Sequence, residues 1–491
     1  MLFNSLEFIF LFLPAVLGVA ALLGSGPARA PWLAGWIALA SLFFYAWWAV
    51  SYLAVLLASI GGNFLLGAAI ARQGPGPAAR RLAAAGIVAN LLGLGFFRYA
   101  PFLAGEAHLL FDCQLPILAW GLPLGISFFT FQQIAYLVDL SRGETRQPGF
   151  AAYAFAVTLF PHLIAGPIVR YREILPQVEG PGRTLGVTRE NLAIGLTIFS
   201  FGLFKKTVIA DAMIRFADRP FDAAAAGVTV PLLDAWVGML AFALQIYFDF
   251  SAYSDMAVGL ARMLGIRLPA NFNAPYKATS IVEFWRRWHM TLSRFLRDYL
   301  YVPLGGNRKG PARRYLNLLL TMVLGGLWHG AGWTFLLWGF LHGAGLALCH
   351  LWRALVGPSR GSRLGRLAGW APTLLFVLLC WVPFRAADWS AAMAYYGDLL
   401  GRPAGQRLYS AAEEAWPVAL ALAIALLLPT LEQIMARVRP VLEPTAPPLA
   451  GWRARWFLWA PSTRWALIAG LAFAFAVSNA FSVTKFLYFD F

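Results

Sequence analysis

Two histidines lie in the sequence contexts that most favour chemistry. His329 follows Trp328 and precedes Gly330 in a glycine-rich apolar stretch, and His289 ends a stretch rich in arginine and aromatic residues. An imidazole titrates near neutral pH and can take a proton from a hydroxyl group, which is otherwise a poor nucleophile at that pH. The pair therefore indicates general-base chemistry, in which one histidine moves a proton while the other holds a substrate.

Each histidine also has a plainer interpretation. An ionisable side chain at membrane depth marks a functional site by default, but His329 fits a hydrogen-bonded position in a helix interface equally well. Taken alone, His289 is better explained as an interfacial histidine that faces water or lipid headgroups. Catalysis is favoured only when the two are considered together.

A metal site is the main rival use of these imidazoles. His329 and His342 are 13 positions apart, and His342 and His350 are eight apart. Neither spacing places two ligands one helical turn apart beside a carboxylate, as a helical metal motif requires. We expect no metal and no bound cofactor.

Polar residues recur within the apolar stretch 236–264. Gln245, Asp249 and Tyr253 follow one another at four-residue spacing and share a helix face, and Asp255 comes next. Buried carboxylates need partners, which we expect Arg286 or Arg287 to provide. A structural network is favoured here over direct catalysis.

Composition places the chain in a membrane. Of its 491 residues, 60% are hydrophobic and 13% charged, whereas soluble domains are about a quarter charged. At about 20 residues per span, the chain allows roughly 11 or more transmembrane helices. We expect an all-α polytopic protein in the lipid bilayer, folded as a single domain over residues 1–491. The expected spans are 6–24, 31–50, 52–71, 82–103, 115–140, 191–209, 236–264, 315–329, 333–352, 370–384, 416–431 and 465–481.

Three other segments are not expected to be regular spans. Prolines interrupt residues 150–169, which predicts a re-entrant hairpin. Residues 281–304 carry four arginines, each costing about 3 kcal/mol at the bilayer centre, so we expect a helix half-buried at the cytoplasmic interface. Residues 437–455 form a linker rich in proline and arginine before the last span.

The formal net charge of +16 has two explanations, nucleic-acid binding and the positive-inside bias of cytoplasmic loops. The basic residues lie in short loops between apolar stretches, so the second is favoured and no nucleic-acid partner is expected. Asn307, Arg308 and Lys309 could bind the phosphates of a donor such as coenzyme A. Ordinary loop charge explains them at least as well.

The chain ends in an aromatic tail, residues 484–491, which contains Tyr488. Four aromatic side chains at a chain end should dock in lipid or in a groove and fix the Tyr488 hydroxyl. The alternative is a simple interfacial anchor.

The sequence resembles the membrane-bound O-acyltransferase (MBOAT) family, in its bacterial alginate O-acetyltransferase branch, over nearly the whole chain. The resemblance rests on residues 160–167, 245–257, 271–306 and 325–330 and on the tail. It implies that His329 matches the catalytic histidine and His289 the second active-site position. Residues 271–330 would then be the catalytic core, in a ring of helices and re-entrant segments around a central funnel or tunnel. The residues expected to support or orient the substrate are Trp328, Arg286, Gln245, Asp249, Tyr253, Asp255 and Asn271.

The resemblance also implies a reaction. Cytoplasmic acetyl-CoA would be the donor, and the acetyl group would cross the bacterial inner membrane to an extracytoplasmic polysaccharide, with an alginate-type exopolysaccharide favoured. A periplasmic SGNH-type partner would complete the transfer, and Tyr488 would be a first acceptor in an acyl relay. Peptidoglycan or cellulose acetylation by the same chemistry is the alternative.

Two other function classes remain open. In a transporter, the buried histidines with Asp249 and Asp255 would form a proton or substrate path, although we find no inverted repeats. In a scaffold of a polysaccharide export complex, neither histidine would matter.

Overall fold

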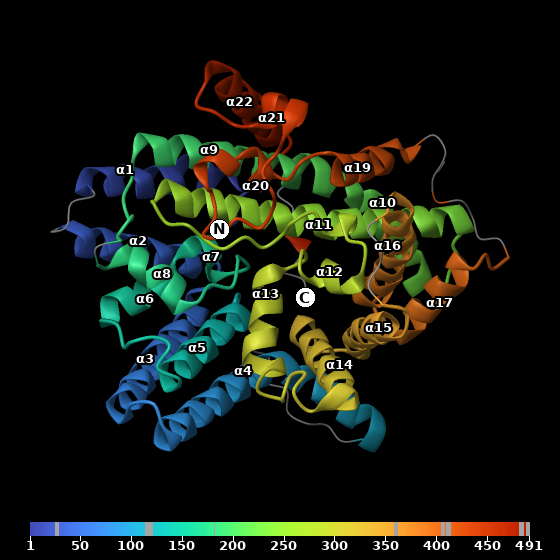
Figure 1. Ribbon diagram of the computed structural model, residues 1–491, viewed down its shortest axis with the longest axis horizontal. Coiled ribbons are helices and arrows are strands. Elements are labelled where there is room, and N and C mark those ends of the chain that lie inside the picture. Colours follow the sequence, from blue (N-terminus) through green and yellow to red (C-terminus); the bar gives the residue numbers. More distant parts are fainter. Residues whose placement is uncertain are drawn as a thin grey trace. The chain divides into compact units, whose positions relative to one another are not determined.

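The computed structural model describes residues 1–24, 29–112, 121–180, 182–357, 362–403, 408, 414–480 and 486–487. All regular elements in these residues are helices, which confirms the all-α prediction (Figure 1). They pack as two compact units. The first comprises residues 1–203, 253–270 and 431–485, and the second comprises 204–252, 271–430 and 486–491. The single-domain assignment stays a prediction.

The first unit begins with the N-terminal helices. Its elements are η1 (Phe8–Phe12), α1 (Leu13–Leu23), α2 (Ala30–Ala46), α3 (Val50–Gln73), α4 (Pro77–Phe111), α5 (Ile126–Ser141), α6 (Phe150–Thr158), α7 (Phe160–Leu163), α8 (Tyr171–Val178), α9 (Arg189–Phe204), the end of α11 (Leu232–Met263), α20 (Leu431–Ile434), η6 (Ala436–Val438), α21 (Gly451–Phe457) and α22 (Thr463–Ser478).

The predicted interruption near Pro161 is present in this unit. Helix α6 ends at Thr158, and α7 is a single turn that starts after Leu159. The Phe160 backbone N–H, freed from the helix ladder, donates to the Ser41 hydroxyl at 3.1 Å. A side chain thus satisfies the broken backbone, as a buried polar group requires.

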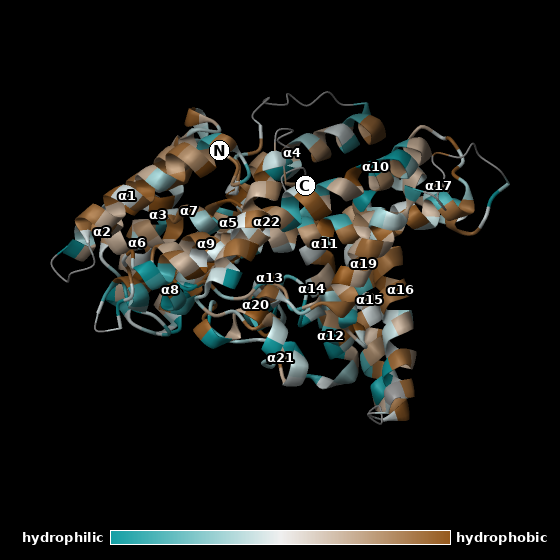
Figure 2. Cartoon of the chain, turned by 90° about the horizontal axis from the view of Figure 1, so that it is seen from above, coloured by the Kyte–Doolittle hydropathy of each residue, from teal (hydrophilic) through white to brown (hydrophobic). Residues whose placement is uncertain are grey.

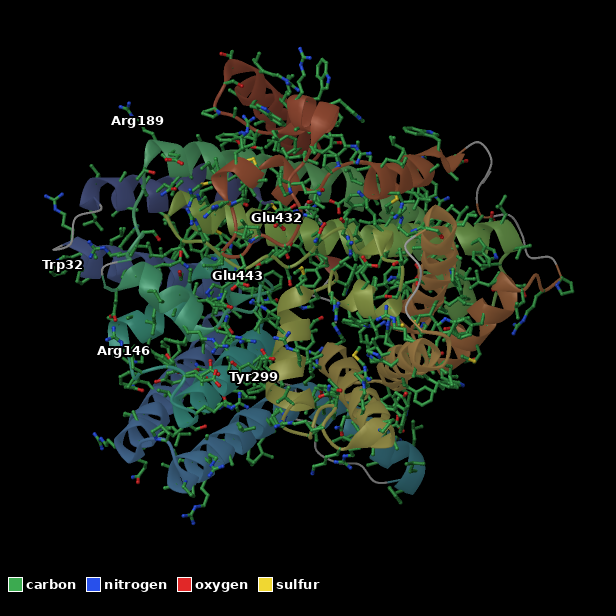
Figure 3. The ribbon with its side chains drawn as sticks, in the orientation of Figure 1. Trp32, Arg146, Arg189, Tyr299, Glu432 and Glu443 are labelled. Atoms are coloured by element: carbon green, nitrogen blue, oxygen red, sulfur yellow. The ribbon has the colours of Figure 1, made fainter. Side chains whose placement is uncertain are left out.

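The predicted linker 437–455 is tied to the helices of the first unit. The Glu432 carboxylate, labelled in Figure 3, accepts hydrogen bonds from the backbone N–H and the hydroxyl of Thr445, both at 2.6 Å. Leu442 N–H also donates to the Leu268 carbonyl at 3.1 Å. Hydrogen bonds therefore fix the middle of this segment.

The second unit contains both candidate histidines. Its elements are η3 (Lys205–Ala210), α10 (Asp211–Ala225), the start of α11, η4 (Pro275–Lys277), α12 (Ile281–Trp285), α13 (Met290–Leu296), η5 (Arg297–Tyr301), α14 (Gly310–His329), α15 (Trp333–Val356), α16 (Arg363–Arg385), α17 (Trp389–Leu399) and α19 (Trp416–Leu427). Its core is aromatic, with Trp288, Trp338, Trp381 and Phe384 all buried.

Six helical segments in the described residues are long and apolar enough to cross a membrane. They are Val50–Gln73, Pro77–Phe111, Arg189–Ala225, Leu232–Met263, Trp333–Val356 and Leu364–Arg385. Figure 2 shows α15 and α16 largely in the hydrophobic colour, whereas α8 and α12 carry much of the hydrophilic colour. This is the pattern of a multi-pass membrane protein.

Glycines let α14 and α15 pack backbone against backbone. A Cβ atom on Gly326 would lie 2.3 Å from the Phe335 carbonyl oxygen, and one on Gly339 would lie 2.4 Å from the Met322 carbonyl oxygen. Both distances are too short for any side chain, so these positions need glycine, as in other close helix pairs within membranes. The resulting hairpin carries His329 at the end of α14, beside the turn into α15.

The expectation of one amphipathic helix over residues 281–304 is wrong. The segment forms α12, a turn, α13 and the π-helical η5. His289 sits at the break with φ of 39°, in the left-handed region that side chains rarely adopt. The four arginines correctly indicate that residues 281–304 do not span the membrane, but they do not predict the turn at His289.

Candidate active site

Aromatic rings surround His329. Its side chain is buried, and its ring meets the rings of Trp328, Trp338 and Phe384 edge to face, at centroid distances of 4.8, 4.9 and 5.2 Å. The helix ends immediately after it, because Gly330 is extended. Close-packed rings exclude water, which strengthens any electrostatic interaction that the imidazole makes.

A hydrogen bond to Asn271 orients His289. The His289 ring is fully buried, and its Nδ1 lies 3.0 Å from Asn271 Oδ1. The same oxygen accepts from the Thr291 hydroxyl at 2.9 Å and from the Thr291 N–H at 3.3 Å. An amide oxygen can only accept, so His289 Nδ1 carries the proton and Nε2 keeps its lone pair. Burial lowers the pKa of His289 to about 3, so the imidazole is neutral at physiological pH.

Backbone pairing builds the turn that presents His289. Met290 N–H donates to the Asn271 carbonyl, and Asn273 N–H donates to the Arg287 carbonyl, both at 2.9 Å. These two bonds hold residues 271–273 alongside the turn between α12 and α13. They explain how a histidine is kept in the left-handed region, which costs about 1–3 kcal/mol.

Trp328 lies against both histidines. Its ring centroid is 6.1 Å from that of His289 and 4.8 Å from that of His329. The two residues that the sequence pairs are therefore neighbours of one indole ring within one unit.

His342 extends this cluster on the α15 side. It is fully buried, its ring lies 4.7 Å from Trp338, and its Nδ1 accepts a hydrogen bond from Trp285 Nε1 at 3.2 Å. An indole only donates, so the proton of His342 sits on Nε2. No group of three or more His, Cys, Asp or Glu that could hold a metal ion is found in the described residues.

The predicted partners of Asp249 are wrong. Asp249 Oδ1 lies 2.8 Å from Nζ of Lys206, whose ammonium is also 2.7 Å from Asp211 Oδ1. Arg287 instead pairs with Glu283, four residues before it, at 2.7 Å. Spacing along the chain does not point to Lys206, because it falls within an expected span. A lysine inside an apolar stretch is itself the signal that would have drawn attention to it.

The remaining predicted site residues are distributed as follows. Gln245 is buried in the second unit, and its Oε1 makes no hydrogen bond to any described residue. Tyr253 and Asp255 belong to the first unit, where Tyr253 stacks on Phe3 at 4.8 Å. Tyr488 lies outside the described residues.

The basic residues gather at the end of the second unit's hairpin where α14 starts and α15 finishes. Arg314 donates to His350 Nδ1 at 2.6 Å, and Arg286 and Arg353 lie near the same histidine. Among the described residues, none of the three arginines pairs with a carboxylate. Arg286 is exposed, and no hydrogen bond joins it to His289 or His329.

The predicted donor loop is exposed next to this end of the hairpin. Asn307, Arg308 and Lys309 are all exposed, and the loop is held by Asn317, whose side-chain amide donates to the Gly306 carbonyl at 2.9 Å.

Comparison with known proteins agrees with the resemblance seen in the sequence. The model of the membrane-bound O-acyltransferase (MBOAT) family matches residues 107–381. A peptidoglycan O-acetyltransferase of Helicobacter pylori is 42% identical, covering 82% of this chain and 80% of its own length. A probable alginate O-acetylase of Pseudomonas aeruginosa is also 42% identical, covering 81% of this chain and 74% of its own. A teichoic acid D-alanyltransferase of Bacillus subtilis is 28% identical over 46% of this chain and 58% of its own. The chain therefore belongs to the membrane-bound O-acyltransferase family and is a multi-pass membrane O-acyltransferase.

Proposed function

We propose that this protein is a bacterial inner-membrane O-acetyltransferase that takes the acetyl group of cytoplasmic acetyl-CoA and passes it outward for O-acetylation of a polysaccharide. The observation that carries the proposal is the placing of two buried histidines against Trp328 in one unit of an O-acyltransferase. A ring of roughly 11 or more spanning helices with re-entrant segments around a funnel remains part of this proposal. So does a periplasmic SGNH-type partner that completes the transfer.

His329 is the proposed general base. It takes the proton of the acceptor hydroxyl as the oxygen attacks the thioester carbonyl carbon. A carbon–oxygen bond forms, the carbon–sulfur bond breaks, and His329 passes its proton to the departing sulfur, so coenzyme A leaves as the thiol. A positioned base typically contributes about 10²–10⁴ to the rate of such a step.

The tautomer of His289 defines its proposed role. Nδ1–H is committed to Asn271, so Nε2 offers a lone pair rather than a proton. A lone pair can accept a hydrogen bond from an N–H group of the donor's pantetheine arm but cannot stabilise an oxyanion, and the single proton of the attacking hydroxyl goes to His329. His289 is therefore the proposed donor-orienting residue.

Trp338 is the proposed oxyanion donor, in place of Arg286. Its ring contacts His329, and its Nε1–H is buried and makes no hydrogen bond to any described residue. A buried donor without an acceptor is energetically costly. The oxygen of the thioester carbonyl, which becomes negative during the reaction, would accept this hydrogen bond.

Coenzyme A phosphates are the proposed ligands of Arg286, Arg314 and Arg353, with Asn307, Arg308 and Lys309 nearby in the chain. The three arginines lie near one histidine and have no described carboxylate to neutralise them, which suits a polyanion. Arg314 and His329 are 15 residues apart on α14, about 22 Å along the helix. An extended pantetheine arm is the part of the donor that would bridge this distance.

An alginate-type exopolysaccharide remains the favoured acceptor, and peptidoglycan and cellulose the alternatives. The relatives named for alginate and for peptidoglycan are equally similar to this chain, so the choice needs experiment. Mass spectrometry of the polymers from cells with and without the protein will identify the acceptor as the one that loses acetyl groups.

Proteoliposomes supplied with labelled acetyl-CoA on one face separate the function classes. The proposal predicts label on the protein, or on polymer when the partner is present. Movement of an intact solute would favour the transporter. If the polymer is still acetylated in cells whose protein lacks both histidines, the scaffold would be favoured.

A further inference from the structure

A buried charge cluster in the second unit holds the start of the C-terminal tail. Lys206 is almost fully buried and lies within hydrogen-bond distance of both Asp211 and Asp249. One oxygen of Asp249 binds Lys206, and the other accepts the backbone N–H of Leu487 at 2.9 Å. The carboxylate thus joins the buried lysine to Leu487, a residue 238 positions after Asp249 in the chain.

The residue before Leu487 is fixed by the same lysine. The Phe486 ring is buried, and Lys206 Nζ lies 4.9 Å from its centroid, within cation–π range. Leu487 itself packs partly buried against the unit's hydrophobic core. Two consecutive residues are therefore held by a charge-assisted hydrogen bond, a cation–π contact and apolar packing.

The composition of the cluster favours docking over simple ion pairing. One carboxylate would neutralise Lys206, and Asp211 already lies at 2.7 Å. Asp249 is a second buried carboxylate on Lys206, and a buried carboxylate needs hydrogen-bond donors for both of its oxygens. The Leu487 N–H is such a donor. Because it belongs to the backbone, it is present whatever side chain residue 487 carries, unless that residue is proline.

We propose that Asp249 and Lys206 are positioning residues that dock residues 486–487, so that Tyr488 starts from a fixed point in the unit that carries His329. The inference rests on the proposed function, and also on the expectation from the family resemblance that Tyr488 receives the acetyl group. The tyrosine oxygen bonds to the acetyl carbon and the carbon–sulfur bond breaks. The phenol proton passes to His329 and from there to the departing sulfur, so coenzyme A leaves as the thiol.

Hydrogen exchange of the full-length protein tests the dock without any turnover. We expect the Leu487 amide to exchange slowly in the wild type and in His329→Gln, and rapidly in Asp249→Leu. Leu487→Ala keeps the N–H and should stay protected. Equal exchange rates in the wild type and in a folded Asp249→Leu variant would overturn the dock whatever the protein's function.

Acetylation of Tyr488, followed by mass spectrometry of the C-terminal peptide, tests the role of the dock. Leu487→Pro removes the N–H donor together with the leucine side chain, and the site lies four residues before Phe491 and beyond the end of α22, so folding should survive. Leu487→Ala loses only the side-chain packing and measures its share. Losing the charge-assisted hydrogen bond as well should make Leu487→Pro acetylate Tyr488 about tenfold or more slowly than Leu487→Ala.

The outcomes separate the two proposals. Equal acetylation of Tyr488 in Leu487→Pro and Leu487→Ala would overturn the positioning role. So would a wild type that acetylates polymer without ever labelling Tyr488, although the proposed function would then stand. A wild type that transfers acetyl to nothing would overturn the proposed function, while a protected Leu487 amide would still support the dock.

Discussion

The irregular stretch 271–301 and the α14–α15 hairpin each hold one histidine, and they do so by different means. In the first, a hydrogen bond from Nδ1 to Asn271 fixes the ring and tautomer of His289. In the second, the rings of Trp328, Trp338 and Phe384 enclose His329. The polar arrangement determines which nitrogen can act, and the aromatic one keeps the site dry. Substitutions in the two regions should therefore impair the protein in different ways.

The largest effect is expected where α14 and α15 pack backbone against backbone. In Gly339→Ala the new methyl group would collide with the Met322 carbonyl, and overpacking of this kind costs about 3 kcal/mol, more than the ~1 kcal/mol that alanine gains in a helix. Thermal melting in detergent measures this. Gly332→Ala is the matched control, because its nearest atom lies at an ordinary 3.6 Å. Equal melting temperatures for both variants would contradict the close packing.

The next largest effect is expected among the aromatic rings that enclose His329. Trp338→Phe keeps an aromatic ring beside His329 but removes the indole N–H. Losing one oxyanion donor typically costs about 10²–10³ in rate, so we expect kcat to fall by about that much with little change in KM. A variant with wild-type kcat would show that Trp338 only packs.

The hydrogen bond that orients His289 is tested by Asn271→Leu, which removes the acceptor for His289 Nδ1–H. Losing the group that orients a functional imidazole typically costs about 10–100-fold in activity. Asn271→Asp keeps an acceptor oxygen and should retain more of the transfer rate. Equal rates for the two variants would remove the orienting role of Asn271.

The pH dependence of stability tests the burial of His289. Its folded-state pKa of about 3 lies below the unfolded value, so its contribution is complete above pH 6.5 and is lost as pH falls towards 3. Between pH 7 and pH 5, the loss should reach about 2 kcal/mol in the free energy of unfolding. In His289→Gln this part of the pH dependence should disappear. An unchanged pH slope would contradict a buried, neutral imidazole.

The sequence alone predicted much of this architecture. Length and apolar content indicated the helices, and Pro161 indicated the break after α6, because proline has local consequences that need no tertiary context. The turn at His289 was not predictable, because it depends on backbone bonds to Asn271 and Asn273, which are distant in sequence.

The site residues divide in the same way. His289, His329 and Trp328 were identified from their types and neighbours, and the structure brings them together. Lys206 as the partner of Asp249, and Trp338 as a neighbour of His329, depend on contacts between helices. Spacing along one helix cannot specify such contacts.

The most direct test of the account is acetyl transfer from labelled acetyl-CoA by purified His329→Gln in proteoliposomes. His108→Gln, which alters an exposed histidine on α4, is the matched control. We expect that His329→Gln melts like the wild type, still binds acetyl-CoA and transfers acetyl at least about 100-fold more slowly, while His108→Gln is unaffected. Transfer by a folded His329→Gln at the wild-type rate would contradict the account.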